Sequence, residues 1–596
     1  MQSMRKYRLP VQVKTMKKYN VRFVNQNISV KADEGTTLAK VCDESGLLPD
    51  LVCGGKGTCG KCKVLIEINN EKSSVLACQT KISSDLSVYL TEDDYKRNSV
   101  ILKTAADEGC IFNPSLKKIY KDKKTIKNEC RDEFLRNCRI DVLRTFSELI
   151  NQDNCEGITF IVCDDEIIDV QLNDTASCLY GAAVDIGTTT SVLYVYDLNT
   201  GNLINTYSDL NRQISAGADV ISRINYAGSR TGLNELTGKI MLTLNNMVQR
   251  AEIEIPNLTE NLYNITLCGN STMQHLFFGF RPDSLGTSPF TCITKDYVEV
   301  FGRDMDFKCP DRCKIIFLPL LGGFVGSDTT AVLLTIDGDN KERLIIDLGT
   351  NGEIAAGNIN RYYVASTACG PALEGGSMEC GMRGTDGAIE HVRIENNQVI
   401  LNVIGNKNPA GICGSGIIDT IAELLRNNVI DNTGRMLSSD EYKQMKPYSK
   451  LSERLVEINS INSFILYEGN NKTVYINQKD IRQIQLAKSS IYSGCMTILN
   501  AYGKSIDSID EIIVSGAFGS FMDVCNAIYI GLLPNAVDKI KSIGNGAGKG
   551  AAMFLLDRSM REKCNKIADN SIHYELANDE DFEEGYINNM NFIDLQ

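Results

Sequence analysis

Four cysteines near the N-terminus have the spacing of ligands that hold a metal centre. The stretch CGGKGTCGKC contributes Cys53, Cys59 and Cys62, and the full pattern is Cys53-x5-Cys59-x2-Cys62-x15-Cys78. Thiolates at such spacing bind iron or zinc, because a deprotonated sulfur is a strong ligand for both metals. The glycines of the stretch allow left-handed backbone angles and let amide groups approach sulfur closely. The pattern therefore predicts a metal site formed by these four sulfurs.

A 2Fe–2S cluster fits this pattern better than zinc does. Plant-type ferredoxins use C-x4-C-x2-C with a distant fourth cysteine, and the loop in this chain is one residue longer. Structural zinc usually takes two tight cysteine pairs, and only Cys59 and Cys62 form one here. Without a metal, four free thiols would have to converge by accident. Cys42 lies nearby on the apolar face of a predicted helix, so we expect it to pack in the core.

Two copies of the pattern D-[IL]-G-T, named the Asp-Gly-Thr turns below, lie about 160 residues apart and suggest a nucleotide site. In YGAAVDIGTTTSVLYVYD (180–197) an apolar strand ends in Asp185, and RLIIDLGTNGEIAAG (343–357) repeats this order with Asp347. Amides and hydroxyls in such turns bind phosphate, and the aspartate holds a metal-bound water. The pair predicts a duplicated α/β fold that clamps a nucleotide between its halves. The predicted binding residues of the turns are Gly187, Thr188, Thr189, Thr190, Gly349, Thr350 and Asn351.

Two further glycine-rich segments follow apolar strands. In EIIVSGAFGSFMD (511–523), small residues would let the backbone pack against an adenine or a ribose. The residues concerned are Gly516, Ala517, Phe518 and Gly519. SIGNGAGKGAAMFLL (542–556) looks like a phosphate loop but lacks the Walker spacing and a following Ser or Thr. Close helix packing at the hinge of two lobes is the better interpretation.

The cysteines require a compact β-rich domain to position them. After a basic tail over 1–18, residues 19–32 alternate apolar and polar around an Asn-rich turn, which predicts a β-hairpin. TTLAKVCDESGLL has helical spacing, with Thr36 or Thr37 as its cap, and KVLIEI (63–68) predicts a strand. We therefore expect a β-grasp ferredoxin domain over 19–92.

The chain changes character after this domain. Charge rises and periodicity weakens, so we predict a linker over 93–118. Helical spacing over 129–149 and paired strands over 157–170 predict a small α/β middle domain at 119–178. The fold class is thus a multidomain chain with α+β and α/β parts.

The composition limits the class of protein. A chain of 596 residues, with 43% hydrophobic and 23% charged residues, is expected to fold into several globular domains. The net charge of −13 argues against nucleic-acid binding, which usually leaves a basic surface. We expect no transmembrane segment, because no uninterrupted apolar run is long enough to span a membrane. We expect no signal peptide, because the basic N-terminus lacks an apolar core. The 21 cysteines are too sparse for a secreted disulfide scaffold, which favours a reducing cytoplasm.

The glycine-rich turns resemble those of the superfamily of acetate and sugar kinases, Hsp70 and actin, the ASKHA fold. VDIGTTT looks like its first phosphate motif, IDLGTNGE like its second, and VSGAFGS like its adenosine motif. The resemblance covers roughly residues 180–556. It implies an ATPase domain over 179–596 that binds ATP and Mg²⁺ between two lobes, approximately 179–340 and 341–556. Domain motion linked to ATP turnover is typical of such folds.

The chain after residue 18 resembles the reductive activators of corrinoid proteins, which combine a 2Fe–2S β-grasp domain, a linker, a middle domain and this ATPase fold. Members of that family return the cobalt of a methyl-transferring corrinoid protein from Co(II) to Co(I), driven by ATP. The resemblance implies a Co(II) corrinoid protein as partner, a low-potential electron donor and a homodimer. Further segments that resemble the family are NRQISAGADVISRI (211–224), CGNSTMQHL (268–276), LPLLGGFVGSDTTA (318–331) and ACGPALEGGSMECGMRGTDGAIE (368–390).

The segment STACGPALEGG (366–376) has two interpretations. It places Ser366 and Glu374 in a glycine-rich setting just after the second phosphate motif. One hypothesis is that both contact the corrinoid or the cobalt of the partner. The other is that they make ordinary hydrogen bonds within a loop. As candidate catalytic residues they join Asp185 and Asp347.

Three other functions compete with corrinoid activation. The first is ATP-dependent activation of a different reductase or radical enzyme, but such activators usually share one 4Fe–4S cluster between subunits and lack a ferredoxin domain. The second is a small-molecule kinase fused to a ferredoxin domain, for which the sequence shows no definite substrate base. The third is a redox or ATP-binding scaffold without turnover.

Overall fold

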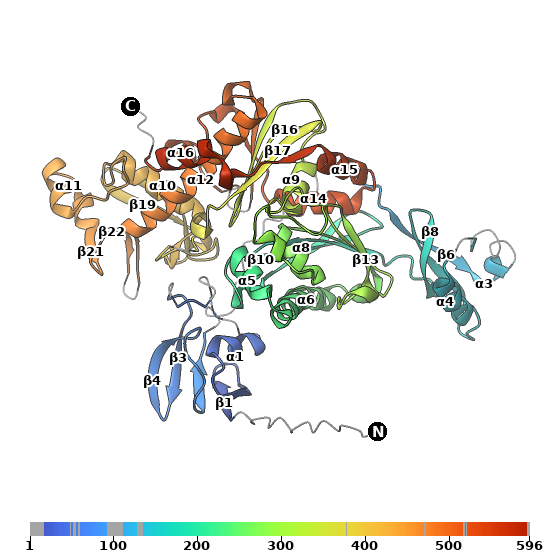
Figure 1. Cartoon of the computed structure of the whole chain (residues 1–596). Coiled ribbons are helices and arrows are strands. Elements are labelled where there is room, and N and C mark those ends of the chain that lie inside the picture. Colours follow the sequence, from blue (N-terminus) through green and yellow to red (C-terminus); the bar gives the residue numbers. More distant parts are fainter. Residues whose placement is uncertain are drawn as a thin grey trace, which may run out of the picture. The chain divides into compact units, whose positions relative to one another are not determined.

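The computed structural model of the chain consists of two compact units (Figure 1). One unit contains residues 1–97 and 215–218, and the other contains residues 98–214 and 219–596. The structure describes residues 17–47, 49, 51, 55–57, 60–91, 111–127, 135–136, 138–376, 378–469, 472–516, 519 and 521–592.

The N-terminal domain has a five-stranded sheet in the order β2-β1-β5-β3-β4, with helix α1 after β2. The predicted hairpin over 19–32 is confirmed, because β1 and β2 are antiparallel neighbours, and the predicted strand over 63–68 is β3. Val21 and Phe23 alternate with exposed residues and are fully buried. Of the two proposed caps, Thr37 caps the helix. The bounds are β1 (Lys18–Phe23), β2 (Ile28–Asp33), α1 (Leu38–Glu44), β3 (Lys63–Ile68), β4 (Glu71–Leu76) and β5 (Leu86–Tyr89).

A small α/β domain has three strands in the order β6-β7-β8, packed by helix α4. Its strands β7 and β8 are the predicted strand pair over 157–170. Strand β6 starts at Leu116, inside the segment predicted as a linker over 93–118. The lysines of this segment made it look like a charged linker in the sequence. In the structure Leu116 is buried and the next residue, Lys117, is exposed, as in a strand with one buried face. The bounds are β6 (Leu116–Asp122), α3 (Lys123–Thr125), α4 (Ile140–Ile150), β7 (Gly157–Cys163) and β8 (Glu166–Leu172); residues 128–134 and 137, in the predicted helical segment, lie outside the described residues.

Two six-stranded sheets follow and repeat one topology, with orders β11-β10-β9-β12-β14-β13 and β25-β24-β15-β16-β17-β26. Each contains an antiparallel meander whose first strand, β9 or β15, carries the aspartate of an Asp-Gly-Thr turn. A parallel strand, β12 or β24, lies on the other side of that first strand, so that Asp185 pairs with Cys268 and Asp347 with Ser515. The predicted duplication is therefore confirmed. The bounds are β9 (Tyr180–Ile186), β10 (Thr190–Asp197), β11 (Leu203–Leu210), β12 (Leu262–Gly269), β13 (Val298–Phe301), β14 (Lys314–Phe317), β15 (Arg343–Leu348), β16 (Gly352–Asn358), β17 (Arg361–Thr367), β24 (Glu511–Ser515), β25 (Ile540–Ser542) and β26 (Ser571–His573).

Helices pack against both sheets, and two small sheets are inserted in the second half (Figure 1). The helices are α5 (Val220–Ala227), α6 (Arg230–Glu254), α7 (Leu258–Asn261), α8 (Ser271–Phe278), α9 (Ser327–Leu334), α10 (Gly414–Arg426), α11 (Ser439–Met445), α12 (Gln478–Tyr502), α13 (Val524–Tyr529), α14 (Gly546–Leu556), α15 (Met560–Asn570) and α16 (Glu580–Asn588). The inserted strands are β18 (Ala388–Glu395), β19 (Gln398–Val403), β20 (Gly411–Ile412), β21 (Leu455–Ile458), β22 (Ile461–Glu468) and β23 (Thr473–Asn477).

Helix α14 joins the core of the first sheet although it lies near the end of the chain. Its Ala551 belongs to the same buried cluster as Ala183 of β9 and Val332 of α9. A Cβ atom on Gly550 would lie 1.8 Å from the carbonyl oxygen of Ala331, so only glycine permits this contact. The predicted role of GAGKGA in close helix packing is confirmed. The lobe bounds at 179–340 and 341–556 remain a prediction, and α14 contributes to the core beside the first sheet.

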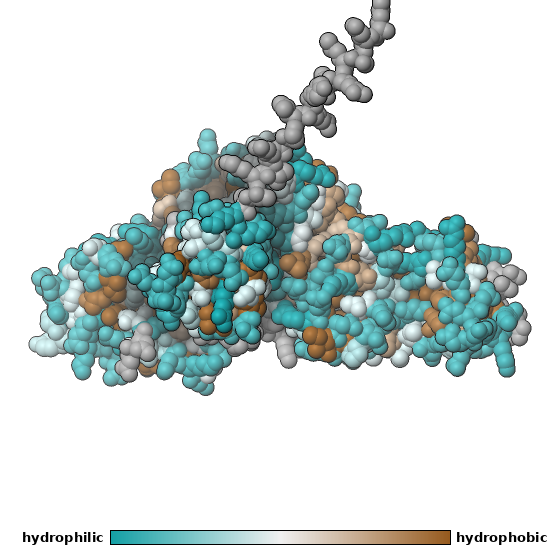
Figure 2. All heavy atoms as spheres, turned by 90° about the horizontal axis from the view of Figure 1, so that it is seen from below, coloured by the Kyte–Doolittle hydropathy of each residue, from teal (hydrophilic) through white to brown (hydrophobic). Residues whose placement is uncertain are grey.

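The face shown in Figure 2 is mainly hydrophilic, and its hydrophobic residues form scattered patches. Within the described ranges, no helix combines the length and the apolar character needed to cross a membrane.

Candidate functional site

The β3–β4 hairpin brings two of the four predicted metal ligands together. Lys63 pairs with Leu76 at the open end of the hairpin, so Cys62 and Cys78, just outside the pair, become neighbours. Their Sγ atoms lie 3.3 Å apart, well beyond the length of a disulfide, and both residues are buried. The other two predicted ligands, Cys53 and Cys59, lie outside the described residues.

The loop beside these thiols has the features expected around a cluster. Gly55, Gly57 and Gly60 all have positive φ, as the sequence predicted for the glycines of this loop. Gln79 donates from Nε2 to the carbonyl oxygen of Gly55 at 2.5 Å and to Cys78 Sγ at 3.6 Å. A donor aimed at a ligand sulfur stabilises the thiolate. The two described thiols and their donor therefore fit a 2Fe–2S cluster, and Gln79 was not identified from the sequence.

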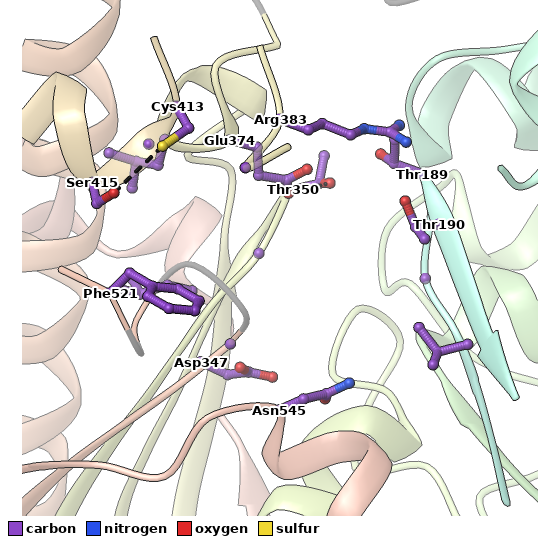
Figure 3. Close-up of a pocket in the computed structure, with 18 of the residues that line it drawn as sticks. Thr189, Thr190, Asp347, Thr350, Glu374, Arg383, Cys413, Ser415, Phe521 and Asn545 are labelled. Carbon is purple, nitrogen blue, oxygen red and sulfur yellow. Dashed lines mark hydrogen bonds between the residues drawn. The ribbon is translucent and has the colours of Figure 1, made fainter. Parts of the chain in front are cut away.

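A cavity of about 610 Å³ lies between the two duplicated halves and contains both Asp-Gly-Thr turns (Figure 3). Each turn is closed by the amide of its glycine: Gly187 donates to the carbonyl oxygen of Thr190 at 3.1 Å, and Gly349 donates to that of Asn351 at 3.0 Å. In both turns the glycine amide thus closes the turn, over three residues in the first and over two in the second. The predicted residues that line the cavity are Asp185, Gly187, Thr188, Thr189, Thr190, Asp347, Gly349, Thr350, Asn351, Glu374 and Gly516.

The predicted adenosine motif in the segment 511–523 contributes only some of its residues to the cavity. Gly516 lines it at the end of β24. Gly519 is not among the described lining residues, and its carbonyl oxygen accepts a hydrogen bond from Ser542 Oγ at 3.1 Å. Ala517 and Phe518 lie outside the described residues. Phe521 projects its ring toward the cavity and adds a flat apolar surface to its lining (Figure 3).

Ser366 and Glu374 are bonded to residues that line the cavity. Glu374 itself lines it, and Glu374 Oε1 accepts a hydrogen bond from Thr350 Oγ1 at 2.9 Å. Ser366 pairs with Glu353 across β16 and β17, and its Oγ donates to Glu353 Oε1 at 3.4 Å. Glu374 is therefore connected to the second Asp-Gly-Thr turn, and Ser366 to the strand that follows it. Their predicted contact with a corrinoid remains a prediction.

Three polar residues of the site were missed in the sequence. Asp328 lies in the first turn of α9, within the segment LPLLGGFVGSDTTA, and Glu353 is the second residue of β16, the strand after the second Asp-Gly-Thr turn. Asn545 caps α14 and donates from Nδ2 to Asp185 Oδ2 at 3.2 Å and to Tyr194 Oη at 3.0 Å. Asp328 and Asn545 could have been found in the sequence, because each is an acidic or amide residue at the glycine-rich start of a helix.

Negative charge is concentrated in the cavity. Burial is the main cause that raises the pKa of Asp185 and Asp347 to about 6 and that of Asp328 to about 7. The carboxylates also repel one another, which raises the pKa of Asp328 and Glu353 further. Such a site favours a divalent cation. The acidic lining residues are Asp185, Asp328, Asp347, Glu353, Glu374 and Glu390.

Arg383 is the one lysine or arginine among the described residues that line the cavity. Its side chain extends from the second half toward Thr189 of the first turn (Figure 3). Its charge opposes the rise in the pKa of Glu374 that burial causes. Arg383 thus places a positive charge across the cavity from the first Asp-Gly-Thr turn.

The raised pKa of Asp328 predicts a pH-dependent stability. A carboxyl whose pKa rises from 3.8 to about 7 on folding binds its proton more tightly in the folded state. Its stabilising contribution is present below pH 4 and is lost as the pH rises through about 7. We therefore expect Asp328→Asn to raise the melting temperature by a few degrees at pH 8 and by less at pH 5.5. Thermal scans with EDTA and without nucleotide check this, and an equal effect at both pH values would contradict it.

Three comparisons with known proteins agree with this architecture. Residues 22–83 match the 2Fe-2S iron-sulfur cluster binding domain, residues 180–341 the RACo middle region, and residues 341–596 the C-terminal domain of RACo, the ASKHA domain. A solved structure of a reductive activator for corrinoid, iron-sulfur protein has a TM-score of 0.73 and 28% identity, covering 96% of this chain and 98% of that one. The predicted fold class is thereby confirmed.

Two curated proteins are similar to this chain, and the more similar of the two shows its family. The chain is 24% identical over 453 residues to the [Co(II) methylated amine-specific corrinoid protein] reductase of Methanosarcina barkeri, covering 70% of this chain and 77% of that protein. It is 42% identical over 583 residues to the corrinoid activation enzyme RamQ of Eubacterium limosum, covering 95% of this chain and 98% of that protein. The protein described above, with its thiol hairpin and its duplicated nucleotide cleft, belongs to the family of corrinoid activation enzymes.

Proposed function

We propose that this protein is an ATP-dependent reductive activator that transfers one electron to the Co(II) corrinoid of a methyltransferase corrinoid protein and so regenerates Co(I). The observation that carries the proposal is the presence, in one chain, of a paired-thiol hairpin and a duplicated nucleotide cleft. The resemblance to corrinoid activation enzymes along nearly the whole chain supports it. Proposed cofactors are a 2Fe–2S cluster, ATP and Mg²⁺.

The N-terminal domain would hold the electron carrier. Cys53, Cys59, Cys62 and Cys78 would hold a 2Fe–2S cluster, which would supply one electron at a time. The hairpin fixes Cys62 and Cys78 as neighbours, and their burial excludes water from both sulfurs. Gln79 donates to Cys78 Sγ and would stabilise added negative charge there.

The cleft would bind Mg-ATP with its phosphates between the two turns. The amides and hydroxyls of Thr188–Thr190 and Thr350, with the amide of Asn351, would supply donors, and Asp185 and Asp347 would hold Mg²⁺. Arg383 would meet the phosphates from the second half, where a cation stabilises charge that develops during hydrolysis. Ser366 and Glu374 would position Glu353 and Thr350 beside the second turn.

ATP is needed because reduction of a Co(II) corrinoid is an uphill step for an ordinary donor. A one-electron gap of about 59 mV corresponds to about 1.4 kcal/mol. A nucleotide shifts this balance only if it favours one conformation that also binds the corrinoid partner differently. We propose that closure of the duplicated halves on Mg-ATP is that conformation. The remaining partners we propose are a low-potential electron donor and a second copy of the chain, in the cytoplasm.

An anaerobic optical assay tests the proposal against its alternatives. The protein is reduced with titanium citrate and mixed with a Co(II) corrinoid protein encoded near its gene, and the Co(I) absorption band is followed with and without Mg-ATP. We expect the band to require both the corrinoid protein and Mg-ATP. ATP-dependent reduction of another enzyme, with no Co(I) from several corrinoid proteins, would favour a different target. Phosphorylation of a small molecule by the chain would favour the kinase.

A further inference from the structure

A fully buried arginine lies directly behind the first phosphate turn. Arg223 on α5 is 0% exposed. Its Nη2 donates to the carbonyl oxygen of Thr188 at 2.5 Å, and its Nη1 donates to Gln213 Oε1 at 3.3 Å. Burying a guanidinium costs several kcal/mol unless its hydrogen bonds are satisfied, so the position needs a reason. Burial lowers the pKa of Arg223 to about 9, and the group remains a cation at neutral pH.

The same turn is held by two buried asparagines. Asn211 donates from Nδ2 to the carbonyl oxygen of Gly187 at 2.9 Å, and its backbone amide donates to the carbonyl oxygen of Thr189 at 2.9 Å. Asn270, at the end of β12, donates from Nδ2 to Thr188 Oγ1 at 2.9 Å. Three successive carbonyl groups of the turn are therefore fixed by neighbours from other segments.

These contacts determine where the amide groups of the turn point. In a planar trans peptide the N–H of one residue points opposite to the carbonyl of the residue before it. Because Arg223 holds the Thr188 carbonyl, the N–H of Thr189 points away from Arg223. The same reasoning applies to the N–H groups of Thr188 and Thr190. Asn211 holds the carbonyls that precede them, those of Gly187 and Thr189. All three threonines line the cavity, so a phosphate there would meet donors that are already oriented.

We propose that Arg223 is a positioning residue for the phosphates of the nucleotide. It orients the Thr188–Thr189 peptide and adds a fixed positive charge behind a cleft that six carboxyl side chains line. The inference rests on the proposed ATP cleft and adds to it a residue that does not itself line the cavity. Arg223 would affect the binding of the phosphates and not that of the nucleoside. Comparing the affinities for Mg-ATP and for adenosine therefore tests the proposal.

The test is to measure the affinity of the full-length chain for Mg-ATP and for adenosine by calorimetry. For Arg223→Gln we expect the affinity for Mg-ATP to fall about 10–100-fold, as for loss of a charge-assisted hydrogen bond, with adenosine affinity changed less than about twofold. Arg223→Lys keeps the charge without the planar fork and should lose less. The matched control is Arg343→Gln. Arg343 is also buried, is bonded to Glu511 and Asp339, and starts β15 away from the turns.

The possible results separate this inference from the proposed function. Equal losses for adenosine and Mg-ATP in both Arg223 variants would mean that Arg223 only supports the fold, and would overturn the inference. Unchanged Mg-ATP affinity in Arg223→Gln, or the same selective loss in Arg343→Gln, would also overturn it. If Arg223→Gln does not fold, the Arg223→Lys variant decides by the same comparison, the loss of Mg-ATP affinity against the loss of adenosine affinity. A wild-type chain that binds no Mg-ATP would overturn the proposed function itself.

Discussion

Cys62→Ser is expected to abolish electron transfer to the corrinoid while leaving nucleotide binding intact. The Sγ atom of Cys62 lies 3.3 Å from that of Cys78 at the end of the β3–β4 hairpin, and a hydroxyl is a poor replacement for a soft sulfur ligand. We expect Co(I) formation to fall by at least about 100-fold, with iron and sulfide content reduced in parallel. The measurements are metal and sulfide analysis, the Co(I) band, and calorimetric Mg-ATP binding on the same preparation.

Cys42→Ala is the matched control for this variant. Cys42 is also a fully buried cysteine of the N-terminal domain, but it lies in helix α1, and burial raises the pKa of its thiol to about 12. The variant loses some stability through the cavity it creates and keeps the cluster. Normal iron content and Co(I) formation in Cys62→Ser would contradict the assignment of the ligands. Loss of the cluster in Cys42→Ala would show that the effect of Cys62→Ser is not specific to the proposed ligands.

Asp347→Asn is expected to stop ATP turnover without harm to the fold or the cluster. The side chain lies in the cleft beside the second turn, and the amide preserves its shape while removing the charge proposed to hold the waters of Mg²⁺. We expect ATP hydrolysis and ATP-dependent Co(I) formation to fall about 10²–10³-fold together. Because burial raises the pKa of Asp347 to about 6, loss of its charge should leave stability unchanged or higher.

The control for Asp347→Asn is a buried aspartate outside the cleft. Asp419 on α10 is 3% exposed and bonded to His391 and Asn526, and it is not among the residues that line the cavity. Asp419→Asn should affect stability more than turnover, because it leaves part of a hydrogen-bonded network unsatisfied. Full hydrolysis by Asp347→Asn would show that the aspartate of the second turn is not needed for the metal.

The parts of the fold that could be predicted are those encoded in short stretches. The two Asp-Gly-Thr turns each join a strand to its antiparallel neighbour, so strand periodicity and turn residues identified them together. The β3 strand and the hairpin before it were predicted for the same reason. Residues whose partners lie far away in sequence could not be found. Asn545 reaches Asp185 only because α14 packs against the first sheet.

The remaining gaps have similar physical causes. Asp328 and Glu353 are ordinary acidic residues until the two halves bring them into one cavity, and a single sequence gives no measure of that proximity. Arg223 lies within a segment that resembles the family, but its contact with Thr188 depends on a fold that brings α5 to the first Asp-Gly-Thr turn. Strand β6 was missed because its exposed face is rich in lysine.

The most direct test of the central claim is a single-turnover measurement of electrons, cobalt and ATP together. The protein is reduced by one electron per chain, freed of reductant, and mixed anaerobically with a Co(II) corrinoid protein in the presence or absence of Mg-ATP. The account predicts that one Co(I) appears for each cluster oxidised, only when ATP is present, and with concurrent release of phosphate. Equal Co(I) formation without ATP, or ATP hydrolysis that leaves the cluster reduced, would contradict it.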